Sequence, residues 1–320
     1  MTDRESRSRL RLSLRWDIHR TWGGAGLAGA GGVAMEFYLR FQDIWDRSPS
    51  ALSLFFAPAF FLAIAVEAYF VIRREGSYPW QSAGVSVLIT IGHFVTQAAT
   101  NGLLFGIIAF GVYQFRLTTI PVSFANWPSV VLLFVLVDLA FYIEHRCSHR
   151  ISFLWASHSV HHSTERMIMP AAFRLTWTPI VSGVFAFYLP IVWLGYDPVW
   201  VYGMASASLT YQFFVHTEFV PRIGWLEWFI NTPSAHRVHH ASNPEYLDRN
   251  FGGVLMIWDH LFGTYQGERP ELVTRFGLLH PRSSPINPFV IAYEGFLNLW
   301  RQLRRIATWR GRFAVIAGPP

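Results

Sequence analysis

The sequence predicts an all-α protein whose helices cross a membrane several times and carry a histidine-rich helical cap at one membrane face. Three observations support this. Hydrophobic residues make up 52% of the 320-residue chain and charged residues only 14%, whereas soluble domains carry roughly 25% charged residues. Several apolar stretches approach the length of about 20 residues that a spanning helix needs. Most of the 13 histidines fall into closely spaced groups, which predicts a two-metal centre in the cap.

Four stretches are candidates for crossing the bilayer. The last of them contains Gly195-Tyr196-Asp197-Pro198, a turn signal that predicts a helical hairpin. The segment 22–35 is rich in Gly and Ala and only marginally apolar, so we expect it to be interfacial or re-entrant. The four candidate spans are 51–72, 85–112, 127–143 and 179–214.

Composition divides the chain into four parts. The first is an Arg-rich and Gly/Ala-rich N-terminal interfacial segment, and the second contains the N-terminal membrane helices. The third carries the histidine groups, and the fourth is a polar, basic C-terminal tail. Their bounds are 1–50, 51–126, 127–267 and 268–320.

Basic residues indicate the orientation in the membrane, because they favour the cytoplasmic side. Arg73 and Arg74 follow the first candidate span, and five arginines lie before residue 16. Both clusters are cytoplasmic only if the segment 22–35 also crosses. We then expect an integral protein of a bacterial inner membrane, with His145 and the other grouped histidines at the cytoplasmic face. Without that crossing, one of the two arginine clusters would lie on the non-cytoplasmic side, against the preference of basic residues for the cytoplasm.

The net charge of +6 does not indicate a nucleic-acid partner. All 26 basic residues are Arg; five lie before residue 16 and five after residue 300. Basic ends that flank apolar segments are typical of contact with anionic lipid headgroups. Cys147 is the single cysteine, so an intramolecular disulfide is excluded.

Nine histidines have a spacing that predicts metal binding. Two lie at i and i+4, and two further groups repeat the pattern His-x-x-His-His, which predicts three imidazoles pointing one way from a helix face. His216 ends the hairpin that returns to the same membrane face, so we expect it to join them. His19, His93, His260 and His280 are interpreted as packed or surface residues. The candidate ligands are His145, His149, His158, His161, His162, His216, His236, His239 and His240.

Nine ligands overfill one ion, whereas two ions with five or six ligands each accommodate them. Imidazole suits zinc, copper, iron and nickel alike, so the residues leave the metal open. A ligating histidine usually donates its second ring N–H to a neighbour. Asp138, inside an apolar span, is costly without a partner, and we expect it to orient a ligand or tie helices together. Candidates for such supporting contacts are Asp138, Glu144, Glu218, Asp248, Asn250 and Asp259.

The region from Asp138 to Tyr265 resembles the fatty acid hydroxylase/sterol desaturase superfamily of membrane di-iron enzymes. The shared pieces are His145-Arg-x-x-His149, His158-x-Val-His161-His162, the stretch from Gln212 to Glu218, Asn231-Thr-Pro-Ser-x-His236-Arg-Val-His239-His240 and Asp248-Arg-Asn250 with Trp258-Asp259. Within the superfamily, Phe-Val-His216-Thr-Glu and the Asn231 stretch are similar to the alkylglycerol monooxygenases. Arg150 is a departure from those enzymes, which have an acid directly after the second histidine of the first pair.

This resemblance implies a catalytic domain over 127–267 that holds two iron ions and uses O₂ to hydroxylate an unactivated C–H bond of a lipid. An ether lipid, a sterol or a fatty-acyl chain would be the substrate. Electrons would come from an external reductant, such as a tetrahydropterin or a redox protein. Aromatic side chains next to the histidine groups are expected to line the lipid route, and ordinary packing is the alternative for each. They are Trp155, Phe173, Trp177 and Phe213.

Two other functions remain open at this level. A sterol or fatty-acyl desaturase, or a C-4 methyl oxidase, would use the same ligands. A non-catalytic metal-binding or transport protein is a different class. It would need a polar path through the spans, and His93, Gln97 and Asn101 form the one such cluster in them.

Overall fold

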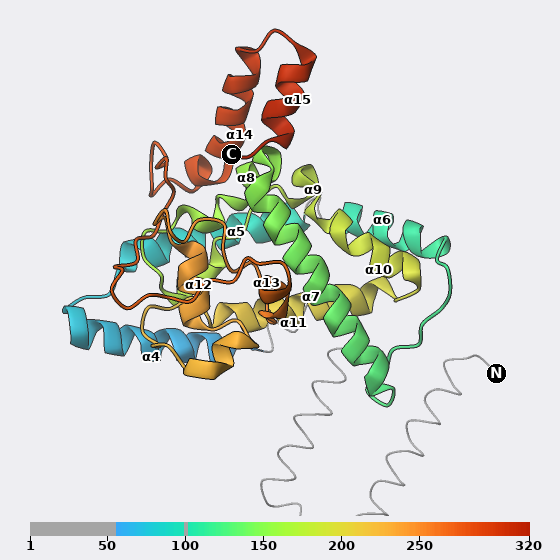
Figure 1. Cartoon of the computed structure of the whole chain (residues 1–320), viewed down its shortest axis with the longest axis horizontal. Coiled ribbons are helices and arrows are strands. Elements are labelled where there is room, and N and C mark those ends of the chain that lie inside the picture. The colour runs from blue at the N-terminus through green and yellow to red at the C-terminus, as the bar shows by residue number, and fades with distance from the viewer. Residues whose placement is uncertain (1–55, 99–101) are drawn as a thin grey trace, which may run out of the picture. The chain divides into compact units, whose positions relative to one another are not determined.

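A computed structural model describes residues 56–98 and 102–320 (Figure 1). The segment 22–35, the N-terminal arginines and His19 lie outside these residues. Within the described ranges every regular element is a helix, and β-pairing is limited to two isolated bridges, Ile230 with Leu255 and Ala241 with Phe276. The all-α prediction is therefore confirmed for this part of the chain.

The helices are described in three sets: those in and around the apolar stretches, the short helices that lie between and after them, and a C-terminal pair. The first set is α4 (Ala57–Glu75), α5 (Trp80–Thr96), α6 (Gly102–Gln114), α7 (Trp127–Arg150), α9 (Pro179–Ser182), η5 (Val184–Tyr188), α10 (Leu189–Leu194) and α11 (Pro198–Phe213). The second is α8 (Ser152–His158), η3 (His161–Ser163), η4 (Met169–Phe173), η6 (Gly224–Trp228), α12 (Pro233–His240) and α13 (Ile257–Leu261). The pair is α14 (Pro288–Arg304) and α15 (Trp309–Ala317).

Among the described residues, α7 is the one helix long and apolar enough to cross a membrane by itself. It covers the predicted span 127–143 and continues to Arg150, so His145 and His149 lie in its last two turns. Pro128 starts the helix, where a missing N–H costs nothing, and Ile151 ends it in an extended conformation.

The other predicted spans are shorter helices than the sequence indicates. The stretch 85–112 is divided between α5 and α6, with residues 99–101 outside the description. The stretch 179–214 breaks at residues 195–197 as predicted, but its first arm is itself divided into α9, η5 and α10. Gly183 and Gly195, both with positive φ, mark two of these breaks. Crossings beyond α7 are therefore a matter for proposal.

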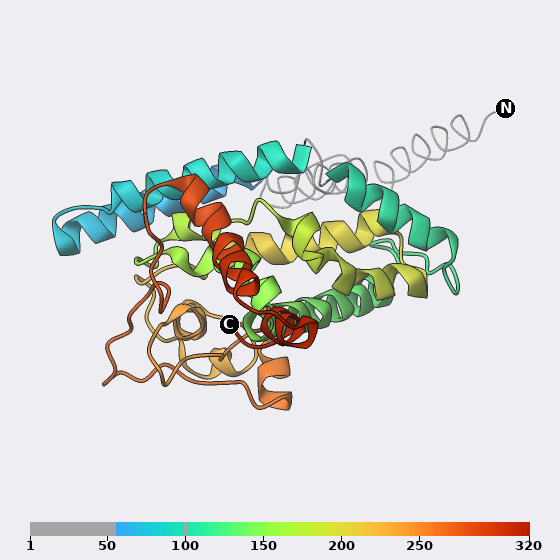
Figure 2. The same ribbon diagram turned by 90° about the horizontal axis from the view of Figure 1, so that it is seen from above.

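The core forms where α7 packs against α10 and α11. Leu133 and Val137 on α7 are buried against Ile191, Val192 and Met204. A second cluster joins residues of α4 and α5 with Ile168. The two helices overlap in Figure 2 but lie at different heights in Figure 1. Because α7 and α11 share this core, their ends bring His149 and the chain after Phe213 into one region.

The C-terminal part differs from the predicted polar tail over 268–320. It contains α14 and α15. Their N-cap residues, Asn287 and Thr308, accept hydrogen bonds from backbone N–H groups of the first turn. Helix α14 is amphipathic: Ile291 and Leu299 are buried while Trp300 is exposed. The arginines of this segment make its overall composition polar, although its buried apolar residues share one helix face.

Candidate metal centre

All nine predicted histidines converge in the structure. They form two groups, and within each group one ring nitrogen per residue lies within 4.8 Å of the others. Neighbouring Nε2 atoms are 3.0–3.2 Å apart. The group of five is His145, His149, His158, His162 and His239, and the group of four is His161, His216, His236 and His240.

The two His-x-x-His-His stretches each divide between the groups, so the prediction of three imidazoles pointing one way is wrong. In α12, His236 and His240 face the group of four, whereas His239 faces the group of five. In the other stretch the chain leaves α8 at Ser159 and resumes as η3. His158 and His162 then join the group of five and His161 the group of four. Each stretch thereby supplies both groups.

Backbone carbonyls orient several rings. Nδ1 of His145 lies 2.9 Å from the Phe251 carbonyl oxygen, and Nδ1 of His216 lies 2.6 Å from that of Gln212. A carbonyl oxygen only accepts, so each Nδ1 carries the proton and each Nε2 presents a lone pair to its group. Lone pairs about 3 Å apart repel one another unless a cation lies among them. The donor set therefore fits a metal ion in each group.

Burial keeps these rings neutral. It lowers the pKa of His216 to about 4, because the imidazolium would lose its hydration, and the hydrogen bond to Gln212 offsets this in part. Burial, followed by repulsion from neighbouring histidines, lowers the pKa of six others well below the usual range. These are His158, His161, His162, His236, His239 and His240. Neutral imidazole is the form that binds metals.

One short segment, residues 248–251, contacts the outer side of three rings in the group of five. The carbonyl oxygens of Arg249 and Phe251 accept from His239 and His145 at 3.0 and 2.9 Å. Asp248 Oδ1 lies 3.7 Å from His149 Nδ1. The nearness of His149, and then of Arg150, lowers the pKa of Asp248. Asp248 therefore lies beside the ring of His149.

Asn250 supports the rings indirectly. It has a φ of 56°, a conformation that Asn tolerates better than most residues. Its side-chain amide donates to two carbonyl oxygens and its Oδ1 accepts from Gln266 N at 2.8 Å. The acceptors are those of Ala235, at 2.9 Å, and Gln266, at 2.8 Å. These bonds tie the segment 248–251 to α12.

Asp138 and Asp259 bind loop backbone rather than histidine. Asp138 on α7 accepts from Val254 N at 2.9 Å, Leu255 N at 3.2 Å and Trp258 Nε1 at 2.9 Å. It is therefore the helix-tying group of the two possibilities. Asp259 accepts from the amides of Phe251 and Gly252, each at 2.8 Å, and so holds the carbonyl-bearing segment in place.

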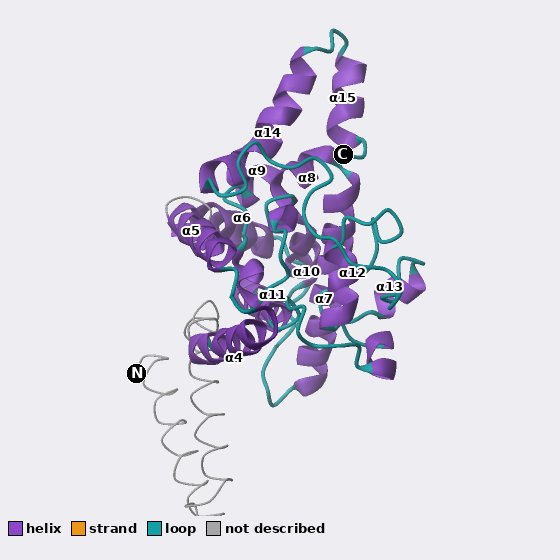
Figure 3. Ribbon diagram, turned by 90° about the vertical axis from the view of Figure 1, so that its left-hand side faces the viewer, coloured by secondary structure: helices purple, strands orange, loops and turns teal. Residues whose placement is uncertain are grey.

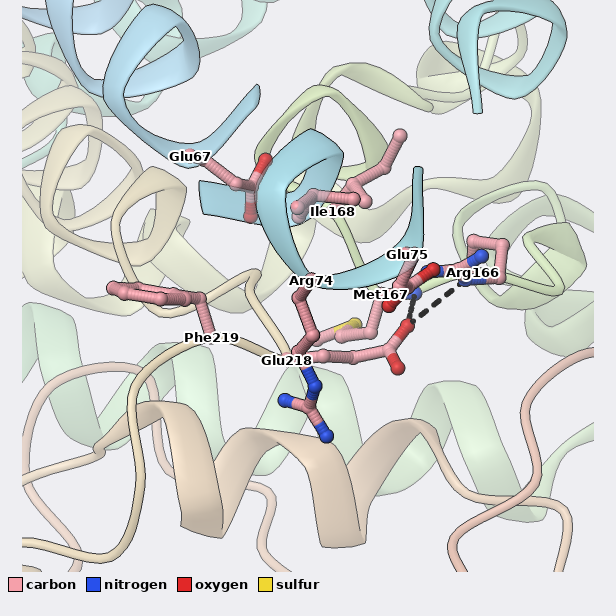
Figure 4. Close-up of a pocket in the computed structure, with 9 residues that line it drawn as sticks. Glu67, Arg74, Glu75, Arg166, Met167, Ile168, Glu218 and Phe219 are labelled. Atoms are coloured by element: carbon pink, nitrogen blue, oxygen red, sulfur yellow. Dashed lines mark hydrogen bonds and ion pairs between the residues drawn. The ribbon is translucent and has the colours of Figure 1, made fainter. Parts of the chain in front are cut away.

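Glu144 and Glu218 have other partners. Glu144 accepts from Ser148 at 2.8 Å. Glu218 accepts from Met167 N at 2.9 Å and from Arg166 at 3.3 Å, as Figure 4 shows. It lines a pocket of about 100 Å³ beside the end of α4, smaller than the roughly 300 Å³ at which small-molecule sites begin.

The four predicted lining aromatics separate into different environments. The ring of Trp155 lies 5.0 Å from that of His149. Phe173 and Phe213 contact each other at 5.1 Å. Trp177 instead donates to the Ile89 carbonyl oxygen at 2.7 Å and packs between α5 and α14. Of the four, Trp155 is the one in ring contact with the histidine groups.

Comparison with known proteins identifies the region that holds the two histidine groups. Residues 130–264, which hold all nine histidines, match the family model described as fatty acid hydroxylase. The matched region is thus a fatty acid hydroxylase domain, and the relatives that the chain resembles are lipid hydroxylases, monooxygenases and a sterol desaturase. No solved structure gives a significant match to it.

Three relatives show the range of this superfamily around the chain. Alkylglycerol monooxygenase of Homo sapiens is 35% identical over 188 residues, 58% of this chain and 41% of that protein. An ornithine lipid hydroxylase of Rhizobium tropici is 27% identical over 61% of this chain and 56% of its own length. A Delta(7)-sterol 5(6)-desaturase of Gibberella zeae is 24% identical over 72% and 73%. The chain spans about two fifths of the length of the alkylglycerol monooxygenase.

Several residues around the hydroxylase histidines were not predicted. Arg237, between two of them, donates to Glu268 at 2.8 and 2.6 Å and to the Thr217 carbonyl oxygen at 3.1 Å. It thereby joins α12 to the chain after His216. Arg237 could have been singled out from the sequence, because it is a charged residue inside a histidine stretch. Nothing in the sequence around Glu268 pointed to its pairing with Arg237.

Proposed function

We propose that this hydroxylase-family chain is a membrane oxygenase that binds two iron ions on its nine histidines. The observation that carries the proposal is the division into five and four converging Nε2 atoms. Each number suits one five- or six-coordinate ion with a position left for a non-protein ligand. Bound iron would supply the O₂-dependent oxidation of an unactivated C–H bond.

The chain's own contribution is to hold and shield these ions. The carbonyls of Gln212, Arg249 and Phe251 fix three ring tautomers, which leaves the Nε2 lone pairs for metal. Burial of the ligand rings, of which His216 is 2% exposed, keeps bulk water from the site. Trp155 stands beside His149 and is our candidate for the lipid-facing wall.

Membrane residence is supported by more than α7. Helices α4 and α5 expose large apolar side chains that water would not favour, including Phe61 at 72% and Val95 at 62%. We propose that α4–α6 and α9–α11 cross with α7, since members of this superfamily are membrane enzymes. The histidines at the end of α7 would then lie at the cytoplasmic face, and the membrane would be a bacterial inner membrane.

The substrate class follows from the relatives. Their printed names specify an alkylglycerol, an ornithine lipid and a sterol, so we propose that this chain hydroxylates a lipid. Arg150, where an acid was expected from the alkylglycerol monooxygenases, is paired with Asp248 at 2.8 Å. A separate electron donor, a tetrahydropterin or a redox protein, would supply the reducing equivalents.

Desaturation is the second candidate. It is favoured by the similarity to the sterol desaturase, which extends over 72% of this chain. The same ligands would serve, because the outcome depends on where the substrate carbon is held.

Metal analysis of the purified full chain tests the centre. We expect about two irons per chain. His161→Ala removes a ligand of the group of four and His239→Ala removes one of the group of five, so each variant should lose the iron of its own group. His280→Ala, at an exposed histidine outside both groups, is the matched control and should keep both. A single labile zinc would contradict the proposal.

Lipid profiles of cells with and without the gene test the substrate. Accumulation of an ether lipid, a sterol or an unmodified acyl chain in the deletion distinguishes the candidates. Unchanged profiles, in cells that express an iron-loaded protein, would reject a lipid substrate.

A further inference from the structure

The α14–α15 hairpin lies outside the matched family region and has a surface that nothing in the described chain covers. Figures 1 and 3 show both helices projecting from the rest of the described part. Ile291 and Ala292 at the base of α14 are buried. Toward the other end the large apolar side chains are exposed: Leu297 at 47%, Trp300 at 53%, Trp309 at 72% and Phe313 at 64%.

The same surface carries uncompensated positive charge. Residues 295–320 contain five arginines and no acidic residue, which gives a side-chain charge of +5. None of the five arginines forms an ion pair among the described residues. Arg304 lies over the Trp300 ring at 4.7 Å and Arg310 over the Trp309 ring at 5.5 Å. On each of the two helices an exposed arginine thus lies against an exposed tryptophan ring.

The base of the hairpin is fixed near the end of the apolar helix α7. Ser152, two residues beyond α7, donates from its backbone N to the Gly318 carbonyl oxygen at 2.8 Å, and its Oγ donates to the same oxygen at 2.9 Å. If α7 crosses the bilayer, the hairpin therefore starts at the level where that crossing ends. Trp and Arg are the residues that proteins place at this level.

We propose that the α14–α15 hairpin lies in the membrane–water interface and binds the headgroups of anionic lipids. Its aromatic side chains occupy the acyl boundary, as in other interfacial amphipathic helices. The positive charges face the anionic headgroups. These charges belong to Arg301, Arg304, Arg305, Arg310 and Arg312. This binding is separate from the oxygenase chemistry and does not depend on the identity of the metal.

A fluorescent reporter on α15 tests the proposal in the full chain. Ala314, exposed and small, is replaced by Cys in a Cys147→Ser background and labelled with an environment-sensitive dye. The protein is then placed in nanodiscs of phosphatidylcholine alone or of phosphatidylcholine and phosphatidylglycerol in equal parts. We expect emission at shorter wavelength in the anionic discs, and a smaller shift at high salt because screening shortens the reach of the charges.

Two charge variants make the result specific. Replacing the five arginines by Gln should remove the difference between the two lipid compositions, whereas replacing them by Lys should retain it. Equal emission in both compositions would overturn the proposal, as would a shift that survives the Gln replacements. A shift seen only in discs that hold two chains would overturn it in favour of a contact between copies.

Discussion

Glu67 is a buried acid whose surroundings explain why α4 matters to the histidines. It is 2% exposed and lies before the matched family region. It accepts from the Tyr78 hydroxyl at 3.0 Å, from Met169 N at 2.9 Å and from the Thr217 hydroxyl. Thr217 directly follows His216, so α4 fixes the chain at a proposed ligand of the group of four.

Replacing Glu67 by Gln should therefore weaken the group of four. The amide brings two N–H donors to a place where three donors already converge, and an unsatisfied buried donor costs about 1–3 kcal/mol. We expect a lower unfolding temperature and, given the proposed two-iron centre, less than the full iron content in the purified protein. Iron content and thermal unfolding are the measurements.

Glu75→Gln is the matched control, because it makes the same change on the same helix at a half-exposed ion pair with Arg166. Such pairs contribute about 0–1 kcal/mol. If the two variants behave alike, Glu67 has no special role in positioning His216.

At the scale of elements, α8 is held between α7 and α14. Helix α8 ends at His158, a proposed ligand of the group of five. Gly295 on α14 lies so close to it that a Cβ at this position would be 2.5 Å from the Ala156 carbonyl oxygen. Arg282 also donates to Ser159 at 2.5 Å. The C-terminal segment thus fixes α8 along its length and at its end.

Gly295→Ala should displace α8, because the obstructing atoms are backbone and cannot turn away. Overpacking of this kind costs about 1–3 kcal/mol, and the displacement would reach His158 two residues after Ala156. We expect reduced stability and reduced iron content, measured by thermal unfolding and metal analysis.

Gly84→Ala on α5 is a control that should raise the stability instead of lowering it. A Cβ there meets nothing within 4 Å, and Ala in an exposed helix is about 1 kcal/mol more favourable than Gly. Full iron content in Gly295→Ala would show that the close approach to Ala156 does not position His158.

At the scale of the whole chain, local patterns predicted which histidines converge but not how they are grouped. The spacing of His145 and His149 holds because one helix carries both, and Gly195 and Pro198 predicted a break because their backbone preferences are local. Which group His161 joins depends on the end of α8, set by contacts with distant residues. Glu67 and Gly295 were not predicted for the same reason, since their roles exist only once α4 and α14 are packed.

The same grouping predicts how the whole chain responds to metal removal. Without cations, nine neutral rings face one another through lone pairs in the two groups, so bound metal should contribute to folding stability. A ligand present at 100 times its Kd contributes about 2.7 kcal/mol per site. We expect a strong chelator to lower the unfolding temperature of the detergent-solubilised full chain, and Fe(II) to restore it, followed by tryptophan fluorescence. A double variant, His161→Ala with His239→Ala, should unfold at a temperature that the chelator does not change. A wild-type chain equally indifferent to chelator would show that the histidine groups are held by the surrounding helices alone.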